Sequence, residues 1–267
     1  MTLNKEAVRL QLGTFDDTDA NTYHPNINGS DSDVKVVRNG DANDTITWAS
    51  DNETVAKVEN GKISAIGVGE ATITATANGI SASCKVFVVL PDAGDDGKIA
   101  ELPIYAPGTV VPVGTKIRNV TVYETVGTGD VTLNNVNIDT LTTKAGGENS
   151  IHLRDSVLGT VVMDSNAGNE ATRLVFSKAT VIENSLTVKD DVKAIIDAEN
   201  SEIKPSIASL EIEGNTTIKN IKVQEIKAKN DIVVENSTVT TIKADTKDKV
   251  SITLDEKTKV DEVKAKK

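Results

Sequence analysis

The segment SIHLRDSVLGTVVMDSNAG, residues 150–168, decides the fold of the C-terminal half of the chain. Its apolar residues Ile151 and Leu153 alternate with polar ones, so a strand here places both on one face. Asp155 and Ser156 form a corner, and then come Val157, a glycine turn and a third apolar stretch. The segment therefore predicts three short strands joined by corners, which together make one triangular coil.

Similar phrases fill the rest of this half, each with apolar pairs followed by a polar corner. They occupy residues 131–146, 150–168, 173–191, 193–214, 217–230, 231–247 and 248–267. Imperfect self-similarity at roughly 16–25 residues indicates a solenoid. With parallel strands about 4.8 Å apart, about seven coils predict a rod about 35 Å long. The alternation has period two rather than 3.6, which argues against helices. An open β-sandwich or several small β-domains is the alternative fold.

The apolar positions recur in a register that predicts three inward faces. The first face comprises Val131/Leu133, Ile151/Leu153, Leu174/Phe176, Ile196/Ala198, Ile218, Ile232/Val234 and Ile252/Leu254. The second comprises Val136/Ile138, Val157, Val181, Ile203, Ile221, Val239 and Val260. The third comprises Leu141, Val161, Leu186/Val188, Leu210/Ile212, Ile226, Ile242 and Val263.

Composition limits the functions that the chain can have. Its 267 residues carry a formal net charge of −11, so an acidic surface repels nucleic acid and anionic membranes. Aromatic residues make up only 3%, so Val, Ile, Leu and Ala must build the core. No apolar run is long enough for a membrane span, and MTLNKEAVRL lacks the apolar core of a signal peptide. The single cysteine, Cys84, is expected to be a small buried apolar residue.

Residues 1–90 read as a separate antiparallel sandwich of short strands. Alternating runs are separated by turn signals, among them Asn60-Gly61 and Asn78-Gly79. Residues 91–107 hold three of the six prolines and have the composition of a linker. The predicted organisation is thus a domain over 1–90, a linker over 91–107 and a β-helix over 108–267.

The segment ITWASDNETVAKVENGKISAIGVGEATITATANGISASCKVFV, residues 46–88, resembles the bacterial immunoglobulin-like domain of group 2. The residues that carry this resemblance are Trp48, Ser50, Asp51, Val55, Ala56, Val58, Gly61, Ile63, Gly67, Gly69, Ala71, Ile73, Ala75 and Cys84. The resemblance implies an immunoglobulin-like sandwich. It assigns Trp48 to the core, and Phe87 and Phe176 are expected to be internal as well.

The phrase GENSIHLRDSVLGTVVMD resembles repeats in surface proteins of Gram-positive bacteria, and the resemblance covers residues 120–267. It implies a right-handed parallel β-helix with the pectin-lyase-like fold. Such proteins often carry immunoglobulin-like and S-layer-homology modules. The expected fold class is therefore all-β, with an immunoglobulin-like sandwich followed by a right-handed parallel β-helix.

One cluster of charged residues suggests a ligand site. His152 and Arg154 share the outward face of one strand, Asp155 follows, and Arg173 is expected one coil away. Two cations on a rigid face could hold a sulfate, a carboxylate or a uronic acid. The alternative is an exposed strand face with a local ion pair. No catalytic residues are predicted, because the paired carboxylates of glycosidases and the nucleophile–base pairs of hydrolases have no counterpart.

Two acidic loops offer oxygen ligands for calcium. Asp17, Asp19 and Asn21 have the one-three-five spacing of a calcium loop, although Thr22 replaces the expected glycine. In the linker, Asp92, Asp95 and Asp96 could hold a calcium ion that stiffens it. The alternative in both places is a solvated acidic loop, and no other cofactor is expected.

These features predict a non-enzymatic structural protein, secreted or on the bacterial cell surface. The immunoglobulin-like domain would be a spacer and the β-helix a rigid rod. Open coil ends favour self-association into homo-oligomers, fibres or a surface lattice, or contact with neighbouring surface domains. The alternatives are an adhesin that binds a glycan, and a polysaccharide lyase or hydrolase that acts on acidic glycans.

Overall fold

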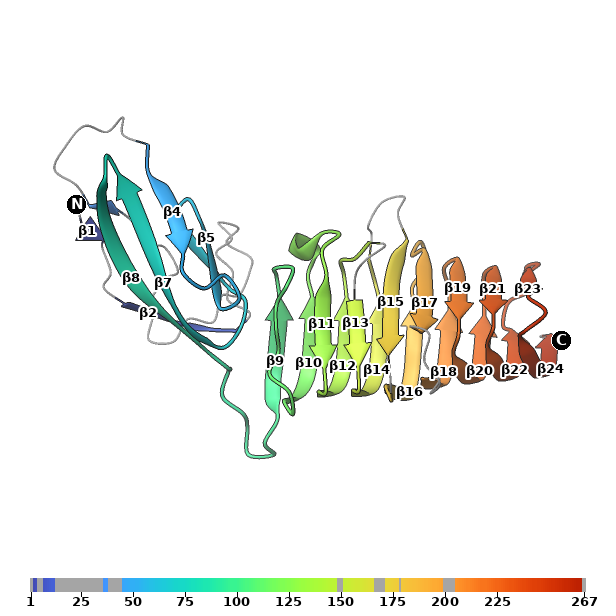
Figure 1. The fold of residues 1–267 in the computed structure, drawn as a ribbon. Coiled ribbons are helices and arrows are strands. Elements are labelled where there is room, and N and C mark those ends of the chain that lie inside the picture. Colours follow the sequence, from blue (N-terminus) through green and yellow to red (C-terminus); the bar gives the residue numbers. More distant parts are fainter. Residues whose placement is uncertain are drawn as a thin grey trace. The chain divides into compact units, whose positions relative to one another are not determined.

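The computed structural model describes residues 2–3, 7–12, 36–37, 45–147, 151–165, 171–177, 179–198 and 205–265. It divides into two compact units (Figure 1). The first comprises residues 1–92 and 108–110, and the second comprises residues 93–107 and 111–267. The described residues are all-β, with one short 3-10 turn at Glu124–Val126 and no α-helix. The predicted fold class is confirmed in both halves.

The first unit is built on a four-stranded sheet in the order β2-β8-β7-β4. Strands β7 and β8 form a long antiparallel hairpin, β4 pairs antiparallel with β7, and β2 pairs parallel with β8. Two antiparallel pairs, β1-β3 and β5-β6, complete it. The strand bounds are β1 Thr2–Leu3, β2 Ala7–Gln11, β3 Val36–Val37, β4 Thr47–Ser50, β5 Ala56–Glu59, β6 Lys62–Ala65, β7 Gly69–Ala77 and β8 Ile80–Val89.

Both Asn-Gly turns of this unit have the conformation that their sequence predicts. Asn60 and Gly61 have φ values of 50° and 86°, and Asn78 and Gly79 have values of 50° and 76°. Two positive φ values match the right-handed twist of the flanking strands, so these turns close the β5-β6 and β7-β8 hairpins.

The core of the first unit is aliphatic. Alternate residues of β7 and β8 point inward, and Ile73 and Cys84 are fully buried there. The predicted burial of Cys84 is therefore confirmed. Trp48 is only half-buried, and Phe87 is 36% exposed. The prediction that Phe87 is internal was wrong, because it occupies an outward position between the buried Val86 and Val88.

The solenoid begins inside the segment that was predicted to be a linker. Strand β9, Ile99–Ile104, pairs parallel with β10 and buries Ile99, Leu102 and Ile104. It is the outermost strand of its sheet. Pro103 is tolerated there because the missing N–H belongs to an edge strand. The strand was missed because the prolines and glycines around this short alternation are typical of a linker.

The second unit is a parallel β-solenoid made of two sheets (Figure 1). The large sheet has the order β9-β10-β12-β14-β16-β18-β20-β22-β24, and the small sheet has the order β11-β13-β15-β17-β19-β21-β23. The remaining strands are β10 Lys116–Val122, β11 Val131–Asn134, β12 Asn137–Thr143, β13 Ile151–Arg154, β14 Val157–Met163, β15 Thr172–Ser177, β16 Val181–Val188, β17 Ala194–Ala198, β18 Ser206–Ile212, β19 Thr216–Lys219, β20 Lys222–Ala228, β21 Ile232–Glu235, β22 Thr238–Ala244, β23 Ile252–Leu254 and β24 Lys259–Ala265.

The register of the large sheet gives the number of coils. From β10 to β24 the strands begin at Lys116, Asn137, Val157, Val181, Ser206, Lys222, Thr238 and Lys259, and each of these residues pairs with the next. The seven steps contain 21, 20, 24, 25, 16, 16 and 21 residues. The prediction of about seven coils is confirmed. At about 4.8 Å per step, the ladder from β9 to β24 is about 38 Å long.

Each coil contains two strands rather than the three that were predicted, because the second and third strands are continuous. In β12 the pairing covers Asn137 and Ile138, skips Asp139, and resumes at Thr140. The chain bends at the skipped residue, so that Ile138 and Leu141, three positions apart, both point inward. Three inward faces therefore arise from one straight strand and one bent strand.

The first and third inward faces are confirmed along most of the solenoid. The second is confirmed at Val136, Ile138, Ile221 and Val239, which are buried, but not at Val157, Val181 and Val260. The register stacks Ile138, Leu158, Ile182, Ile207, Val223 and Val239, all of them buried. Val157 and Val181, which were predicted to point inward, are only half-buried. Their places at the interior are taken by the preceding corner residues Ser156 and Thr180, which are buried. Ile203 lies outside the described residues.

At four described corners that follow small-sheet strands, the chain has a left-handed residue followed by a buried side chain. Asn135, Asp155, Asn220 and Asn236 have φ values between 45° and 59° there. This conformation suits Asn and Asp best among residues with a Cβ. The next residue is often a buried hydroxyl: the Ser156 Oγ donates to the carbonyl of Arg154 at 2.7 Å and accepts from the Val136 N–H at 3.2 Å. The bond from Val136 satisfies a backbone N–H at the corner, and the bond to Arg154 adds a second donor to a carbonyl that also accepts from the Asn135 N–H.

The corner residues also connect neighbouring coils. The side-chain amide of Asn236 donates to Asn220 Oδ1 at 2.7 Å, and the amide of Asn220 donates to Asp197 Oδ1 at 3.0 Å. Burial decreases at the last coil, where Leu254 is 41% exposed and Val263 is 57% exposed. These two residues were predicted to be inward, and their stacked neighbours Val234 and Ile242 are fully buried.

Candidate functional site

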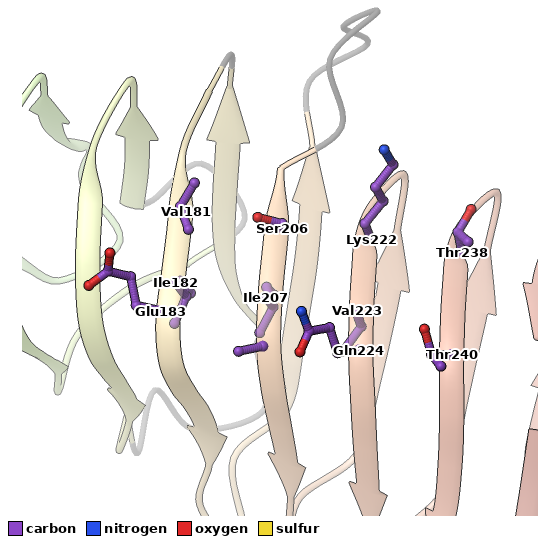
Figure 2. Close-up of a pocket in the computed structure, with 11 residues that line it drawn as sticks. Val181, Ile182, Glu183, Ser206, Ile207, Lys222, Val223, Gln224, Thr238 and Thr240 are labelled. Atoms are coloured by element: carbon purple, nitrogen blue, oxygen red, sulfur yellow. The ribbon is translucent and has the colours of Figure 1, made fainter.

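A groove lies on the outer side of the large sheet, across the first halves of β16, β18, β20 and β22 (Figure 2). Its volume is about 440 Å³, which is within the range of small-molecule sites. It is lined by Val181, Ile182, Glu183, Ser206, Ile207, Ala208, Lys222, Val223, Gln224, Thr238 and Thr240.

The groove forms because neighbouring strands differ in length and in side-chain size at the bend. Strand β16 contains an irregularity in register between Ile182 and Ser185, where it has one residue more than β14 or β18. Such a bulge bends its strand and redirects a side chain. On β18 the outward residues Ser206 and Ala208 are small, whereas the next strand carries Lys222 and Gln224. The floor therefore lies along β18, between the bulged strand and the long side chains of β20.

Polar groups surround this floor. Figure 2 shows the Gln224 amide reaching toward β18 and the Thr240 hydroxyl directed toward β20, with Ser206, Lys222 and Thr238 at the upper rim. The Glu183 carboxylate lies on the β14 side of its strand in the same view. Among the residues that the structure describes, none of these six side chains is hydrogen-bonded or ion-paired.

Beyond the bend, on the second halves of the same strands, the outward charges are paired with one another. Lys227 binds Glu211 at 2.8 Å, and Lys243 binds Glu225. The hydrogen bond from Lys243 and its positive charge lower the pKa of Glu225 from its usual value, and the hydrogen bond to Glu211 raises the pKa of Lys227. The groove and the paired surface therefore share strands but differ in whether their polar groups have protein partners.

The predicted anion site is only partly assembled. His152 and Arg154 do share the outward side of β13, and Asp155 adopts the left-handed corner conformation with φ of 47°. The register places Val175 beside His152, and Arg173 lies two residues earlier on β15. The guanidinium of Arg173 donates to Asp197 Oδ2 on β17, in the next coil, at 2.6 Å. Asp197, which the sequence did not single out, is therefore an acidic partner of Arg173.

The linker acids lie on exposed chain, and one of them is held by arginine. Asp96 Oδ2 accepts from the Arg118 guanidinium at 3.0 Å, and this bond lowers the pKa of Asp96. Asp92 and Asp95 are exposed. The described residues contain no group of three or more His, Cys, Asp or Glu side chains that could hold a metal ion. Asp17, Asp19 and Asn21, the other calcium prediction, lie outside the described residues.

The groove was missed from the sequence, although two signals pointed toward it. The repeat at 173–191 is followed by the longest coil step, 25 residues, and the next two steps have only 16. One residue of the 25-residue step is the bulge residue of β16, between Ile182 and Ser185. The groove lining contains one carboxylate, that of Glu183, whereas glycoside hydrolysis needs two, one on either side of the bond.

Comparison with known proteins identifies the first unit. Residues 32–86 match the family model for the bacterial Ig-like domain, group 2. A stretch of 54 residues is 55% identical to the minor capsid protein of Enterobacteria phage T3. That match covers 20% of this chain and 12% of the capsid protein.

No solved structure shows significant similarity to the chain. No helix in the described ranges is long and apolar enough to cross a membrane. The protein therefore consists of a bacterial immunoglobulin-like domain of group 2 followed by a parallel β-solenoid.

Proposed function

We propose that the chain is a non-enzymatic structural module displayed on an extracellular surface, in which the immunoglobulin-like domain is a spacer and the solenoid a rigid rod. The observation that carries the proposal is the uninterrupted parallel ladder of nine strands in the large sheet and seven in the small one. Apart from the residues at the bend, the strands inside such a ladder pair with the coils on both sides, so extension or bending breaks many bonds together.

The side chains favour the same role. The interior is a continuous aliphatic stack, and much of the outer charge is paired between adjacent coils, as in Lys229 with Glu213 at 2.8 Å. These contacts hold coil to coil. Immunoglobulin-like domains of group 2 are non-catalytic and typical of extracellular surfaces. The surface in question is that of a cell or, given the short match to a phage capsid protein, of a virus particle.

A distance measurement between spin labels tests the rod. Asn119 on β10 and Glu262 on β24 occupy the same outward column of the large sheet, seven coil steps apart. Labels on cysteines that replace these two residues should give one narrow distance of about 34 Å plus the label length. The buried Cys84 is replaced by alanine to prevent a third label. A broad distribution would show a flexible chain of coils and would contradict the rod.

The surface and non-enzymatic parts of the proposal need separate tests. Gold-labelled antibody should reach the protein on intact cells or particles without permeabilisation. Incubation with polygalacturonate should release no unsaturated product that absorbs in the ultraviolet. Release of such product by the wild-type protein, lost in Arg154→Ala, would support the lyase alternative instead.

A further inference from the structure

The groove across β16, β18, β20 and β22 differs from the surface beyond the bend on the same strands, where the outward charges are paired. It combines an apolar floor with an amide, three hydroxyls, one amine and, on the β14 side of β16, the Glu183 carboxylate, and these side chains make no described hydrogen bond or ion pair. We propose that it binds a short stretch of a neutral oligosaccharide that runs along the solenoid axis. This site is distinct from the cluster around His152 and goes beyond the structural role proposed above.

The polar groups are suited to hydroxyl-rich ligands. The Gln224 amide offers both a donor and an acceptor, and the hydroxyls of Ser206, Thr238 and Thr240 can act as either. A sugar ring presents the same mixture of donors and acceptors at its edge. Its C–H groups can pack on the methyl group of Ala208 and on the side chain of Val181.

The form of the groove favours an extended ligand over a single ring. Its lining residues come from four consecutive strands, so the groove spans three steps, about 14 Å. Thr238 and Thr240 stand at one end, on β22, and Val181 stands at the other, on β16. The bulge in β16 deepens that end, and bulges of this kind are common beside binding sites.

Other classes of ligand fit less well. A peptide strand recognises a sheet through an open edge, but the groove lies on a face whose backbone groups are already paired within the ladder. Nucleic acids and polyanionic glycans need several cations, whereas the groove has one, Lys222, in a chain with a net charge of −11. A flat aromatic ligand would lack a ring to stack on, since no lining residue is aromatic.

Binding of defined tetrasaccharides to the full chain tests the proposal. The neutral probes are the tetramers of β-1,4-linked glucose and N-acetylglucosamine, the acidic probe is the tetramer of galacturonate, and saturation-transfer NMR detects binding up to about 10 mM. At least one neutral tetramer should bind. Ala208→Phe, which fills the floor from an outward half-buried position, should weaken that binding at least about tenfold.

Two further variants separate the groove from general damage. Gln224→Ala removes the amide that reaches over the floor and should weaken binding by about fivefold to tenfold. Thr217→Ala changes an outward residue of the small sheet and should leave binding unchanged. Thermal unfolding of each variant shows whether the solenoid is intact. The proposal fails if no neutral tetramer binds, if only galacturonate binds, or if Ala208→Phe folds normally and binds as the wild type does. The spin-label distance does not depend on any of these outcomes.

Discussion

The first four coil-forming strands of the large sheet, β10 to β16, and the last four, β18 to β24, form two halves of the sheet. These halves have the same kind of interior and differ on their outer face. On β10, β12, β14 and β16, the outward positions beyond the bend are Asn119, Thr121, Thr140, Thr142, Thr160, Val162, Ser185 and Thr187. On β18, β20, β22 and β24 the same positions are Ser209, Glu211, Glu225, Lys227, Thr241, Lys243, Glu262 and Lys264. At these positions the first half has no charged residue, and the second has six charged residues out of eight.

This difference separates what the fold requires from what it permits. Inward positions are apolar along both halves because every coil must exclude water from the axis. Outward positions only have to suit a strand, so either β-branched hydroxyl residues or alternating charges can fill them. The contribution of these outer positions to stability should then be insensitive to salt and pH in the first half, whereas in the second half it should respond to both.

The largest expected effect comes from the interior and should be equal in the two halves. Leu141 and Ile226 lie in the same inward column and are both 0% exposed. Leu141→Ala and Ile226→Ala should each destabilise the solenoid by about 3 kcal/mol through lost burial and a cavity. Urea unfolding followed by circular dichroism measures the loss. The control is Val263→Ala at the exposed end of the column, which should cost less than about 0.5 kcal/mol. Clearly unequal losses at Leu141 and Ile226 would show that the interiors are not equivalent.

Substitutions at the bend of the large-sheet strands should give the next largest loss of stability. A Cβ at Gly159 on β14 would lie 2.6 Å from the carbonyl oxygen of Asp139, so Gly159→Ala should cost about 2 kcal/mol by forcing the backbone apart. Ala208, at the corresponding bend of β18, already has a Cβ. Ala208→Gly should cost no more than about 1 kcal/mol, from backbone entropy alone. Differential scanning calorimetry on both variants distinguishes them. A smaller loss for Gly159→Ala than for Ala208→Gly would contradict the close approach.

Variants of two corner residues should separate the free-energy cost of the left-handed conformation from that of a lost hydrogen bond. Asn135 and Asn236 have φ values of 50° and 45°, but only Asn236 has a described side-chain bond, to Asn220. Asn135→Ala should cost about 1 kcal/mol for the left-handed conformation, and Asn236→Ala should cost about 1.5 kcal/mol because a hydrogen bond is lost as well. Glycine at each position removes the conformational cost and is the matched control. If Asn236→Gly is as stable as the wild type, the bond to Asn220 contributes nothing measurable.

The smallest effect concerns the paired charges, and it depends on pH. The pKa of Glu225 is lowered in the folded protein by its hydrogen bond from Lys243, so its stabilisation is present above its usual pKa of 4.5 and is lost as the pH falls through the lowered value. Because the pair is partly exposed, Glu225→Gln should cost about 0.5 kcal/mol at pH 7 in low salt. The difference should vanish near pH 3 and in about 1 M salt.

Thr142→Val is the counterpart in the uncharged half. It removes a half-buried outward hydroxyl without changing any charge. Its effect on unfolding should be the same at pH 3 and pH 7. A matching pH dependence in both variants would remove the distinction between the two halves, since it would point to acid effects on the whole solenoid.

The sequence predicted the coils well because each feature they need is local. Alternation with period two, as at Ile151 and Leu153, marks an inward face, and Asn or Asp at a corner marks a left-handed residue. The bend was not predicted, because it depends on a strand that continues through Asp139 while its pairing skips that residue. Because the bend was not predicted, Val157 and Val181 were assigned to the interior, although the residues next to them point inward.

The site was harder to predict than the fold because it arises from differences between coils. The predicted cluster placed His152 and Arg154 correctly on one strand, but the partner of Arg173 depends on which residue of the next coil is adjacent. The groove likewise depends on a bulge in β16 set beside small residues in β18. Neither can be read from a single repeat.

The equal steps near the C-terminal end have a consequence for how the length of the protein can change. From Ser206 to Lys222 and from Lys222 to Thr238 the chain advances 16 residues and stays in register. Because each coil contacts only its neighbours, copying residues 222–237 would add one complete coil without disturbing the pairing on either side. Tandem duplication or loss of a 16-residue unit can therefore change the length of the solenoid in increments of about 4.8 Å.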